Sequence, residues 1–241
     1  MQLTYLLINF FTVIICFIFS FHPKINFYRH FRAFLLSAVL VATVFIIWDA
    51  WFTKLGVWWF DDQYLVGIRF FGLPLEEILF FICIPFSCIF TYFCLTKFLP
   101  MDWKPLPDKI FVITFIIISL FAAVYFREKI YPFMTFLTLG ISLFILYFLL
   151  GAKWIGKAWI VYLILLPGFV LVNGILTGTG LESPIVNYNS ETFIGVRFLT
   201  IPIEDFFYGF ELIIWNLYFF KKLKKEEKIN DNDENIILKS T

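Results

Sequence analysis

Seven apolar runs, each long enough to cross a lipid bilayer, dominate this sequence. Of its 241 residues 61% are hydrophobic and only 15% are charged, and 35 are phenylalanine. A soluble domain of this size would leave much of that apolar surface in contact with water. The sequence therefore predicts an all-α polytopic membrane protein, with spans at about residues 3–21, 33–52, 72–95, 110–126, 132–150, 158–176 and 200–220.

The basic residues indicate how these spans are oriented. If the C-terminus is cytoplasmic, the cytoplasmic loops and the tail hold 14 of the 19 Lys and Arg residues, as the positive-inside rule requires. We therefore expect an integral protein of a bacterial inner or plasma membrane, with its N-terminus outside. The first run has no basic leader and no small-residue cleavage site, so it is interpreted as a retained span. The charged tail is predicted to be disordered.

One stretch of fifteen residues occurs twice. Residues 67–81 and 195–209 share Gly, Arg, Phe, Pro and Glu at a common offset of 128, as from Pro74 to Pro202. Four predicted crossings separate the copies, so both enter the membrane from the same, non-cytoplasmic side. This predicts two parallel three-helix repeats joined by a linking helix, with the working site at their interface. The predicted domains are the repeats at 1–96 and 131–220, the linking helix with its loops at 97–130, and the tail at 221–241.

Each copy places two adjacent acids at the start of an apolar run. Pro74 and Pro202 suit the first turn of a helix, and the acids follow in that turn: Glu76, Glu77, Glu204 and Asp205. A helix N-terminus favours carboxylates, so these acids could simply cap the helices. However, acids in membrane spans are costly and are functional candidates by default.

Two further observations favour a functional site over caps. Arg69 and Arg197 precede the acid pairs at a fixed distance, which allows an ion pair in each half. Glu211 follows Glu204 by seven residues and shares a helix face with Tyr208. An acid two turns into a bilayer span is difficult to explain as a cap.

Paired carboxyl groups in an apolar pocket suit acid catalysis. A carboxyl group held away from water resists ionisation and can donate its proton, while an ionised partner accepts one. A carbocation formed there needs protection from water, and aromatic faces stabilise cations by about 0.5–2 kcal/mol each. The candidate rings near the acids are Trp48, Trp51, Trp58, Trp59, Phe80, Tyr208 and Trp215. The alternative for any one ring is packing against lipid or at the membrane interface.

Other functions fit less well. The last span has no lysine before Lys221, where a retinal protein would need one, and Asp61-Asp62 lacks the second acidic cluster of a magnesium-dependent prenyltransferase. Gly178-x-Gly180 lacks the third glycine and the strand of a dinucleotide-binding fingerprint. The cysteines and histidines lack metal-site spacing, so no metal is predicted. No cofactor is predicted either, and a net charge of +1 without a basic patch outside the tail gives no indication of a nucleic-acid partner. A proton-coupled transporter is the alternative, because paired intramembrane acids also serve proton relays.

The acidic repeats and two further motifs resemble the lycopene cyclase domain family. The motifs are Pro74-Leu75-Glu76-Glu77, Pro202-Ile203-Glu204-Asp205, Trp48-Asp49-Ala50-Trp51 and the stretch from Thr177 to Ser183. That family occurs as two small membrane subunits in actinobacteria and as a fused form elsewhere, which this chain resembles over about residues 1–220. The second acid pair departs from two Glu, and Asn187-Tyr188-Asn189 replaces the Trp-rich loop of the first half.

The resemblance implies an intramolecular lyase or isomerase of carotenoid biosynthesis. It implies cyclisation of the ψ ends of lycopene to β-ionone rings, giving γ-carotene or β-carotene, without net redox and without flavin. The carotenoid and membrane lipid are the expected partners, and a homo-oligomer is left open. The expected catalytic residues are Glu76, Glu77, Glu204 and Asp205, and the expected substrate contacts are Trp48, Asp49, Trp51, Arg69, Arg197, Tyr208 and Glu211. The proton donor, and whether one centre serves both substrate ends, are also left open.

Overall fold

A computed structural model describes residues 2–99 and 105–240, and within them the chain forms seven long helices. They are α1 (Thr4–Ser20), α2 (Phe31–Lys54), α3 (Leu75–Phe98), α4 (Pro105–Tyr125), α5 (Ile130–Phe144), α6 (Ile155–Leu176) and α7 (Ile203–Ser240). Short 3₁₀ turns lie at Phe27–His30 and Asp62–Tyr64, and a π-helical turn at Ile145–Leu149 extends α5. The structure confirms an all-α polytopic membrane protein.

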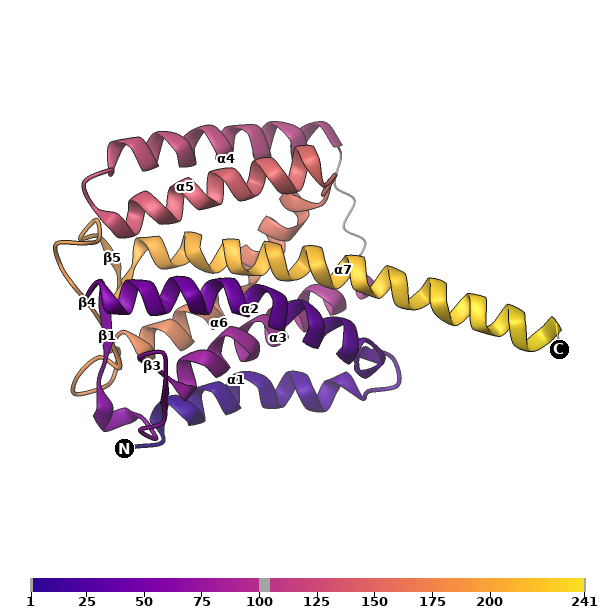
Figure 1. Ribbon diagram of the computed structural model, residues 1–241, viewed down its shortest axis with the longest axis horizontal. Coiled ribbons are helices and arrows are strands. Elements are labelled where there is room, and N and C mark those ends of the chain that lie inside the picture. Colours follow the sequence, from indigo (N-terminus) through magenta and orange to yellow (C-terminus); the bar gives the residue numbers. More distant parts are fainter. Residues whose placement is uncertain (1, 100–104, 241) are drawn as a thin grey trace.

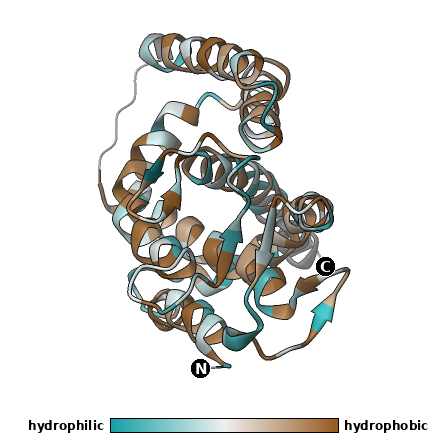
Figure 2. Ribbon diagram, turned by 90° about the vertical axis from the view of Figure 1, so that its left-hand side faces the viewer, coloured by the Kyte–Doolittle hydropathy of each residue, from teal (hydrophilic) through white to brown (hydrophobic). Residues whose placement is uncertain are grey.

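Length and composition match a membrane along most of the bundle. Five helical stretches of the described chain are long and apolar enough to cross a bilayer. Helix α1 is shorter, with 17 residues, and α7 carries Glu204, Asp205 and Glu211 in its apolar part. Seen from the end that carries the strands, the helices are mostly hydrophobic in colour, whereas hydrophilic segments gather in the loops (Figure 2).

The helices run roughly side by side, with α7 next to α2 and with α4 packed along α5 at one edge (Figure 1). The two ends of the chain lie at opposite ends of the bundle, as an odd number of crossings requires. All the strands lie at the end that holds the N-terminus (Figure 1). The bundle therefore has one structured loop end, and the acidic motifs belong to it.

Two short strands join the halves and reveal their symmetry. Strand β1 (Trp58–Phe60) pairs antiparallel with β4 (Val186–Tyr188). Trp59 faces Asn187, which is its own counterpart at the offset of 128. Two backbone hydrogen bonds repeat this exchange: Asp61 N donates to Ile185 O, and Asn189 N donates to Val57 O, each over 2.9 Å. A local two-fold rotation relates such a pairing to itself, which agrees with a parallel duplication.

Each acidic motif folds as a small hairpin followed by a helix. In the first half β2 (Arg69–Phe70) pairs with β3 (Leu73–Pro74), and in the second β5 (Arg197–Phe198) pairs with β6 (Ile201–Pro202). The turns use left-handed backbone at Phe71 (φ 53°) and Leu199 (φ 55°). Each arginine closes its own turn, because Arg69 Nη1 donates to Gly72 O over 3.0 Å and Arg197 Nη1 donates to Thr200 O.

The hairpin changes the expected place of the proline. Pro74 is extended (φ −66°, ψ 150°) and stands at the N-cap, one residue before α3, because it also pairs with Arg69. The prediction that it opens the first turn is therefore wrong by one position. The acids do lie in the first turn of α3 and of α7, as predicted.

The tail also differs from its expectation. The sequence predicts disorder from Lys221 onward, whereas α7 continues to Ser240. A physical reason is available in the composition of the tail. The tail begins with Lys and Glu, which favour helices, and a helix already nucleated in the membrane extends at low cost.

The largest buried hydrophobic cluster of the described residues holds the two halves together. It joins Phe27 of the 3₁₀ turn before α2 to residues of α2, α3, α4, α5, α6 and α7, with Phe86 and Phe210 among them. Because lipid is as apolar as these side chains, the cluster stabilises the bundle through close packing rather than through escape from water.

Candidate functional site

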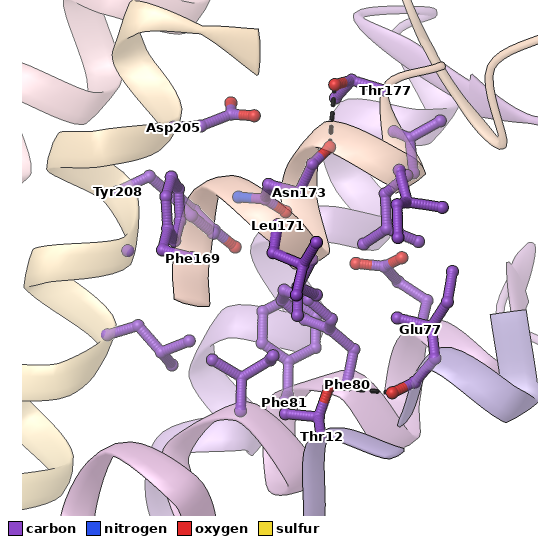
Figure 3. Close-up of a pocket in the computed structure, with 18 of the residues that line it drawn as sticks. Thr12, Glu77, Phe80, Phe81, Phe169, Leu171, Asn173, Thr177, Asp205 and Tyr208 are labelled. Carbon is purple, nitrogen blue, oxygen red and sulfur yellow. Dashed lines mark hydrogen bonds between the residues drawn. The ribbon is translucent and has the colours of Figure 1, made fainter. Parts of the chain in front are cut away.

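A cavity of about 580 Å³ lies between the two halves, at the ends of the helices nearest the strands. Its walls come from α1, α3, α6 and α7, and β1 and β4 close its end. Most of the lining is apolar. Three carboxyl groups reach it: Asp49 of α2, Glu77 of α3 and Asp205 of α7. Figure 3 shows Glu77 and Asp205 on different helices, on opposite sides of the cavity.

Tyrosine hydroxyls hold the two inner acids, Glu77 and Asp205. Tyr5 Oη donates to Glu77 Oε2 over 2.5 Å. Tyr131 Oη donates to Asp205 Oδ1 over 2.5 Å, and Tyr188 Oη donates to Asp205 Oδ2 over 2.9 Å. Both oxygens of Asp205 are therefore occupied. Glu77 Oε1 accepts no hydrogen bond from the described residues, and the side chain lines the cavity.

The outer acids, Glu76 and Glu204, have a different environment. Glu76 Oε1 accepts the backbone N–H of Val66, and Glu204 Oε1 accepts that of Ile194, each over 2.6 Å. Both carboxyl groups are fully buried, and neither lines the cavity. In each half the outer acid therefore fixes the loop that enters the hairpin. These contacts hold a loop and are not helix caps, because their donors lie ten residues before the acids and the N-terminus of α3 has no side-chain cap.

Asp49 supplies a third carboxyl group that has no counterpart in the second half, where Thr177 takes the equivalent position. It is 2% exposed, and its Oδ1 accepts the indole N–H of Trp58 over 2.5 Å. Helix α2 carries the acid and strand β1 carries the tryptophan. The pairing of β1 with β4 thus positions Trp58, which in turn holds the Asp49 carboxyl group at the cavity wall.

Tyr208 lies on α7 one turn after Asp205 and also lines the cavity. Its ring packs edge-to-face against Trp48 and Phe45, with ring centroids 5.2 Å away in both pairs. Its hydroxyl is buried and has no partner among the described residues. Together with Trp58 and Phe80, it brings an aromatic ring to the cavity, as the sequence predicts for rings near the acids.

The other residues expected to contact substrate do not line the cavity: Trp48, Trp51, Arg69, Arg197 and Glu211. The predicted ion pairs between the arginines and the acid pairs are wrong. Arg69 Nη2 pairs with Asp62 Oδ1 over 2.6 Å, and the Arg197 guanidinium lies 4.7 Å from the ring centre of Phe193. The hairpin turns both arginines away from the helix.

Two of the predicted rings, Trp51 and Trp59, are 43% and 50% exposed. Trp215 instead donates its indole N–H to Ser142 Oγ over 2.8 Å, beside Glu211. Trp51 and Trp59 therefore lie at the surface, and Trp215 packs between helices. For these three rings the alternative role, packing rather than substrate contact, describes the structure better.

Sequence reasoning missed the three tyrosines that hold the inner acids. A signal exists for two of them, because Tyr5 and Tyr131 stand at equivalent places in the first helix of each repeat, at an offset of 126. That offset differs by two from the offset of the acidic motifs. Tyr188 lies in a loop that differs between the halves, and its counterpart at the offset of 128 is Phe60, so the repeat gives no signal for it.

The cavity opens toward the membrane between α1 and α6. Its lining includes Leu7 and Phe11 of α1 and Leu171 of α6, which are 48%, 65% and 66% exposed. Side chains that face both the cavity and the outside of a membrane bundle border an opening to lipid. Helix α6 contains Pro167 and Gly168, which weaken its regular hydrogen bonding beside this opening.

A polar contact outside the helices also ties the halves together. Ser183 Oγ donates to Asp61 Oδ2 over 2.8 Å. This hydroxyl, with the N–H groups of Gln63, holds the pKa of Asp61 below its usual value. Across the described residues, no three His, Cys, Asp or Glu side chains are placed to hold a metal ion.

Comparisons with known proteins agree with this duplicated architecture. A family described as lycopene cyclase matches residues 2–95 and, again, residues 128–223, which together make up most of the chain. A bifunctional lycopene cyclase/phytoene synthase of Leptosphaeria maculans is 34% identical over 74 residues. This match covers 31% of the chain and only 12% of the fungal protein. No solved structure matches the chain.

Proposed function

The chain belongs to the lycopene cyclase family, and on that premise we propose that it closes the ψ ends of lycopene into β-ionone rings by acid catalysis. One observation carries the mechanism: two carboxyl groups, one from each half, face a single apolar cavity that opens to the membrane. The substrate is a hydrocarbon dissolved in the bilayer, so a lateral entrance suits it. The reaction moves protons and bonds without net redox, which makes the enzyme an isomerase.

Glu77 is the proton donor in this mechanism. Tyr5 holds one oxygen of the carboxyl group, and the other is free to carry a proton into the cavity. The proton adds to the terminal double bond of the substrate and leaves a carbocation. The neighbouring double bond attacks that cation, which closes a six-membered ring and moves the positive charge into it.

Asp205 is the base that completes the reaction. It removes a proton from a carbon next to the cation, which restores a double bond, so one proton is gained and one is lost per ring. Its two oxygens accept hydrogen bonds from Tyr131 and Tyr188. Hydrogen bonds to a charged group contribute about 1.5–3 kcal/mol each, so these donors favour the ionised form. General acid and base catalysis each contribute about 10²–10⁴-fold.

The rest of the lining protects the cation. Water would trap it, and the largely apolar walls exclude water. The faces of Trp58, Phe80 and Tyr208 are available at the cavity and can stabilise a cation by about 0.5–2 kcal/mol each. Asp49, held by Trp58, adds a negative charge or a dipole at the same wall.

The site lies on the non-cytoplasmic side in this proposal. The strands and the hairpins share the end of the bundle that holds the N-terminus (Figure 1), and the cavity reaches this end at Trp58, Phe60 and Tyr188. The other side holds Lys97 in the last turn of α3, Lys153 in the loop before α6, and the tail. The positive-inside rule then places the tail in the cytoplasm.

Expression in cells that accumulate lycopene tests the proposed function. The wild-type chain is expected to convert red linear pigment into yellow-orange cyclised pigment. A chain with both Glu77→Gln and Asp205→Asn is expected to leave the pigment red while still reaching the membrane. Glu191→Gln, an exposed carboxyl group in a loop, is the matched control and should cyclise normally. Unchanged red pigment with the wild-type chain, together with proton flux in vesicles, would point to a transporter instead.

A further inference from the structure

A duplicated protein can carry two equivalent sites, one for each half. The cavity described above is built from α1, α3, α6 and α7. The two-fold rotation that relates the halves maps these helices onto α5, α7, α2 and α3. The corresponding space between those helices would be a second site, with the same acids on the opposite walls. The structure shows what occupies it.

Large side chains fill this second space. Asn173 and Leu176 line the cavity, and their counterparts at the offset of 128 are Phe45 and Trp48. Both rings pack against Tyr208, at 5.2 Å between ring centroids. Phe45 also belongs to a buried cluster with Val41, Phe81 and Leu212. Large side chains therefore fill the space that the two-fold rotation relates to the cavity.

A small residue of α3 that lines the cavity is likewise replaced by a large one at the equivalent position of α7. Ser87 lines the cavity, and its counterpart is Trp215, which packs onto the filled cluster. Ser142 Oγ accepts the indole N–H of Trp215 over 2.8 Å and donates to Glu211 Oε1 over 2.7 Å. Thr138 Oγ1 donates to the other oxygen of Glu211 over 2.9 Å. Glu211 thus fixes Trp215 rather than facing substrate, which explains an acid that the proposed reaction does not use.

The outer surface of the bundle also differs between the two halves, and again only the side of the cavity is open. Leu7 and Phe11 of α1 border the opening and are 48% and 65% exposed. Their counterparts at the offset of 126, Phe133 and Leu137 of α5, are only partly exposed, and α4 packs along α5 (Figure 1). The linking helix therefore covers part of the surface through which a second opening would lead.

From this asymmetry we propose that the protein has a single catalytic centre, made of Glu77 from one half and Asp205 from the other, and that it closes the two ends of its carotenoid one after the other. This inference rests on the proposed function and adds to it. A single cavity admits one end of a linear substrate. The substrate must then withdraw into the membrane and return with its other end, so a pigment with one ring is a free intermediate in the bilayer.

Counting rings in the product of single variants tests the inference. Glu77→Gln and Asp205→Asn are expressed separately in lycopene-accumulating cells, and linear, monocyclic and dicyclic pigments are separated by chromatography. With one centre, each variant is expected to lose the first ring closure, by about 100-fold or more, so the pigment stays linear. With a centre in each half that works with the acid pair of its own half, Glu76 and Glu77 or Glu204 and Asp205, at least one variant keeps a working centre and makes a monocyclic pigment at the wild-type rate. That second outcome overturns the inference.

Two further arms keep the result interpretable. Co-expression of the two variant chains is expected to give no rings, whereas separate centres would supply both rings between them. Correct folding is checked by the amount of protein in the membrane and by the linear pigment that copurifies with it. If a variant fails to fold, Glu77→Asp and Asp205→Glu replace it. One centre then predicts that both ring closures slow by the same factor, and two centres predict that only one closure slows.

The proposed function and the inference fail in different ways. If the wild-type chain forms no cyclised pigment at all, the proposed function is wrong and the inference falls with it. If the wild-type chain cyclises and either single variant still makes monocyclic pigment at the wild-type rate, only the single centre is wrong.

Discussion

Replacing Tyr131 by Phe removes one of the two hydroxyls that hold Asp205 and leaves the ring in place. The lost hydrogen bond is 2.5 Å long and joins a phenol to the proposed base. A hydrogen bond to a charged group is worth about 1.5–3 kcal/mol. With about 1.36 kcal/mol for each tenfold change in rate, Tyr131→Phe is expected to slow ring closure by about 10- to 150-fold.

Tyr5→Phe is the informative comparison, because Tyr5 holds the proposed acid. Glu77 donates its proton from the neutral form, and a hydrogen bond between neutral groups contributes only about 0.5–1.5 kcal/mol. Tyr5→Phe is therefore expected to slow ring closure by about 2- to 12-fold. The chemistry of the two substitutions is identical, so the order of the two effects reports which carboxyl group is charged.

The assay measures initial rates of cyclised pigment with purified protein in liposomes that contain lycopene. Tyr125→Phe on α4, 72% exposed, is the matched control and should match the wild-type rate. If Tyr5→Phe is more damaging than Tyr131→Phe, the acid and base assignments are reversed. Wild-type rates in both variants would show that these hydroxyls do not act on the reacting groups.

Three further predictions concern the residues around the site. Glu76→Gln and Glu204→Gln keep an oxygen for the N–H groups of Val66 and Ile194 and should retain most activity. The Leu variants leave a partly buried N–H unpaired and should lower stability by about 1–3 kcal/mol in thermal unfolding. Arg69→Ala and Arg197→Ala should change the rate less than about threefold and stability by at most about 1 kcal/mol, because these exposed side chains only close the hairpin turns. A large loss of rate would show that the arginines take part in the reaction. Ser183→Ala should lower stability by less than about 1 kcal/mol. The bond to Asp61 lowers the folded-state pKa of that acid, so its contribution is present above the usual pKa and is lost as pH falls through the lowered value; a difference that grows at acid pH would contradict this.

The sequence predicts the large-scale architecture well because that architecture follows from composition and repetition. Apolar length gives the seven helices, and the offset from Pro74 to Pro202 gives a parallel duplication. The acids stand in the first turns of α3 and α7 because the proline-containing motif ends where those helices begin. These are local or periodic signals, and one sequence is enough to show them.

The division of labour within each acid pair is not a local signal. Glu76 and Glu77 are neighbours in the chain, yet a helix turns successive side chains by about 100°. One therefore faces the hairpin loop and the other the cavity. The hydroxyls that distinguish them come from Tyr5 and Tyr131, more than seventy residues away. Only the packing of the helices brings these groups together.

The contacts of the arginines and the filling of the second space could not be predicted from the sequence, for related reasons. A fixed spacing between Arg69 and the acids suggests an ion pair, but the left-handed residue Phe71 reverses the chain between them and turns the side chain outward. The repeat likewise suggests two equal sites. The replacement of Asn173, Leu176 and Ser87 by large aromatic residues in the other half is visible in the sequence, but its meaning depends on knowing which of these residues line the cavity.

Conversion of lycopene by the purified protein alone tests the central claim most directly. The protein is placed in liposomes that contain lycopene, with no flavin or nicotinamide nucleotide added, and pigments are followed by chromatography and mass. The account predicts cyclised pigment with the same mass as lycopene, because each ring gains and loses one proton. Pigment that stays linear, or that cyclises only when a redox nucleotide is supplied, would contradict it.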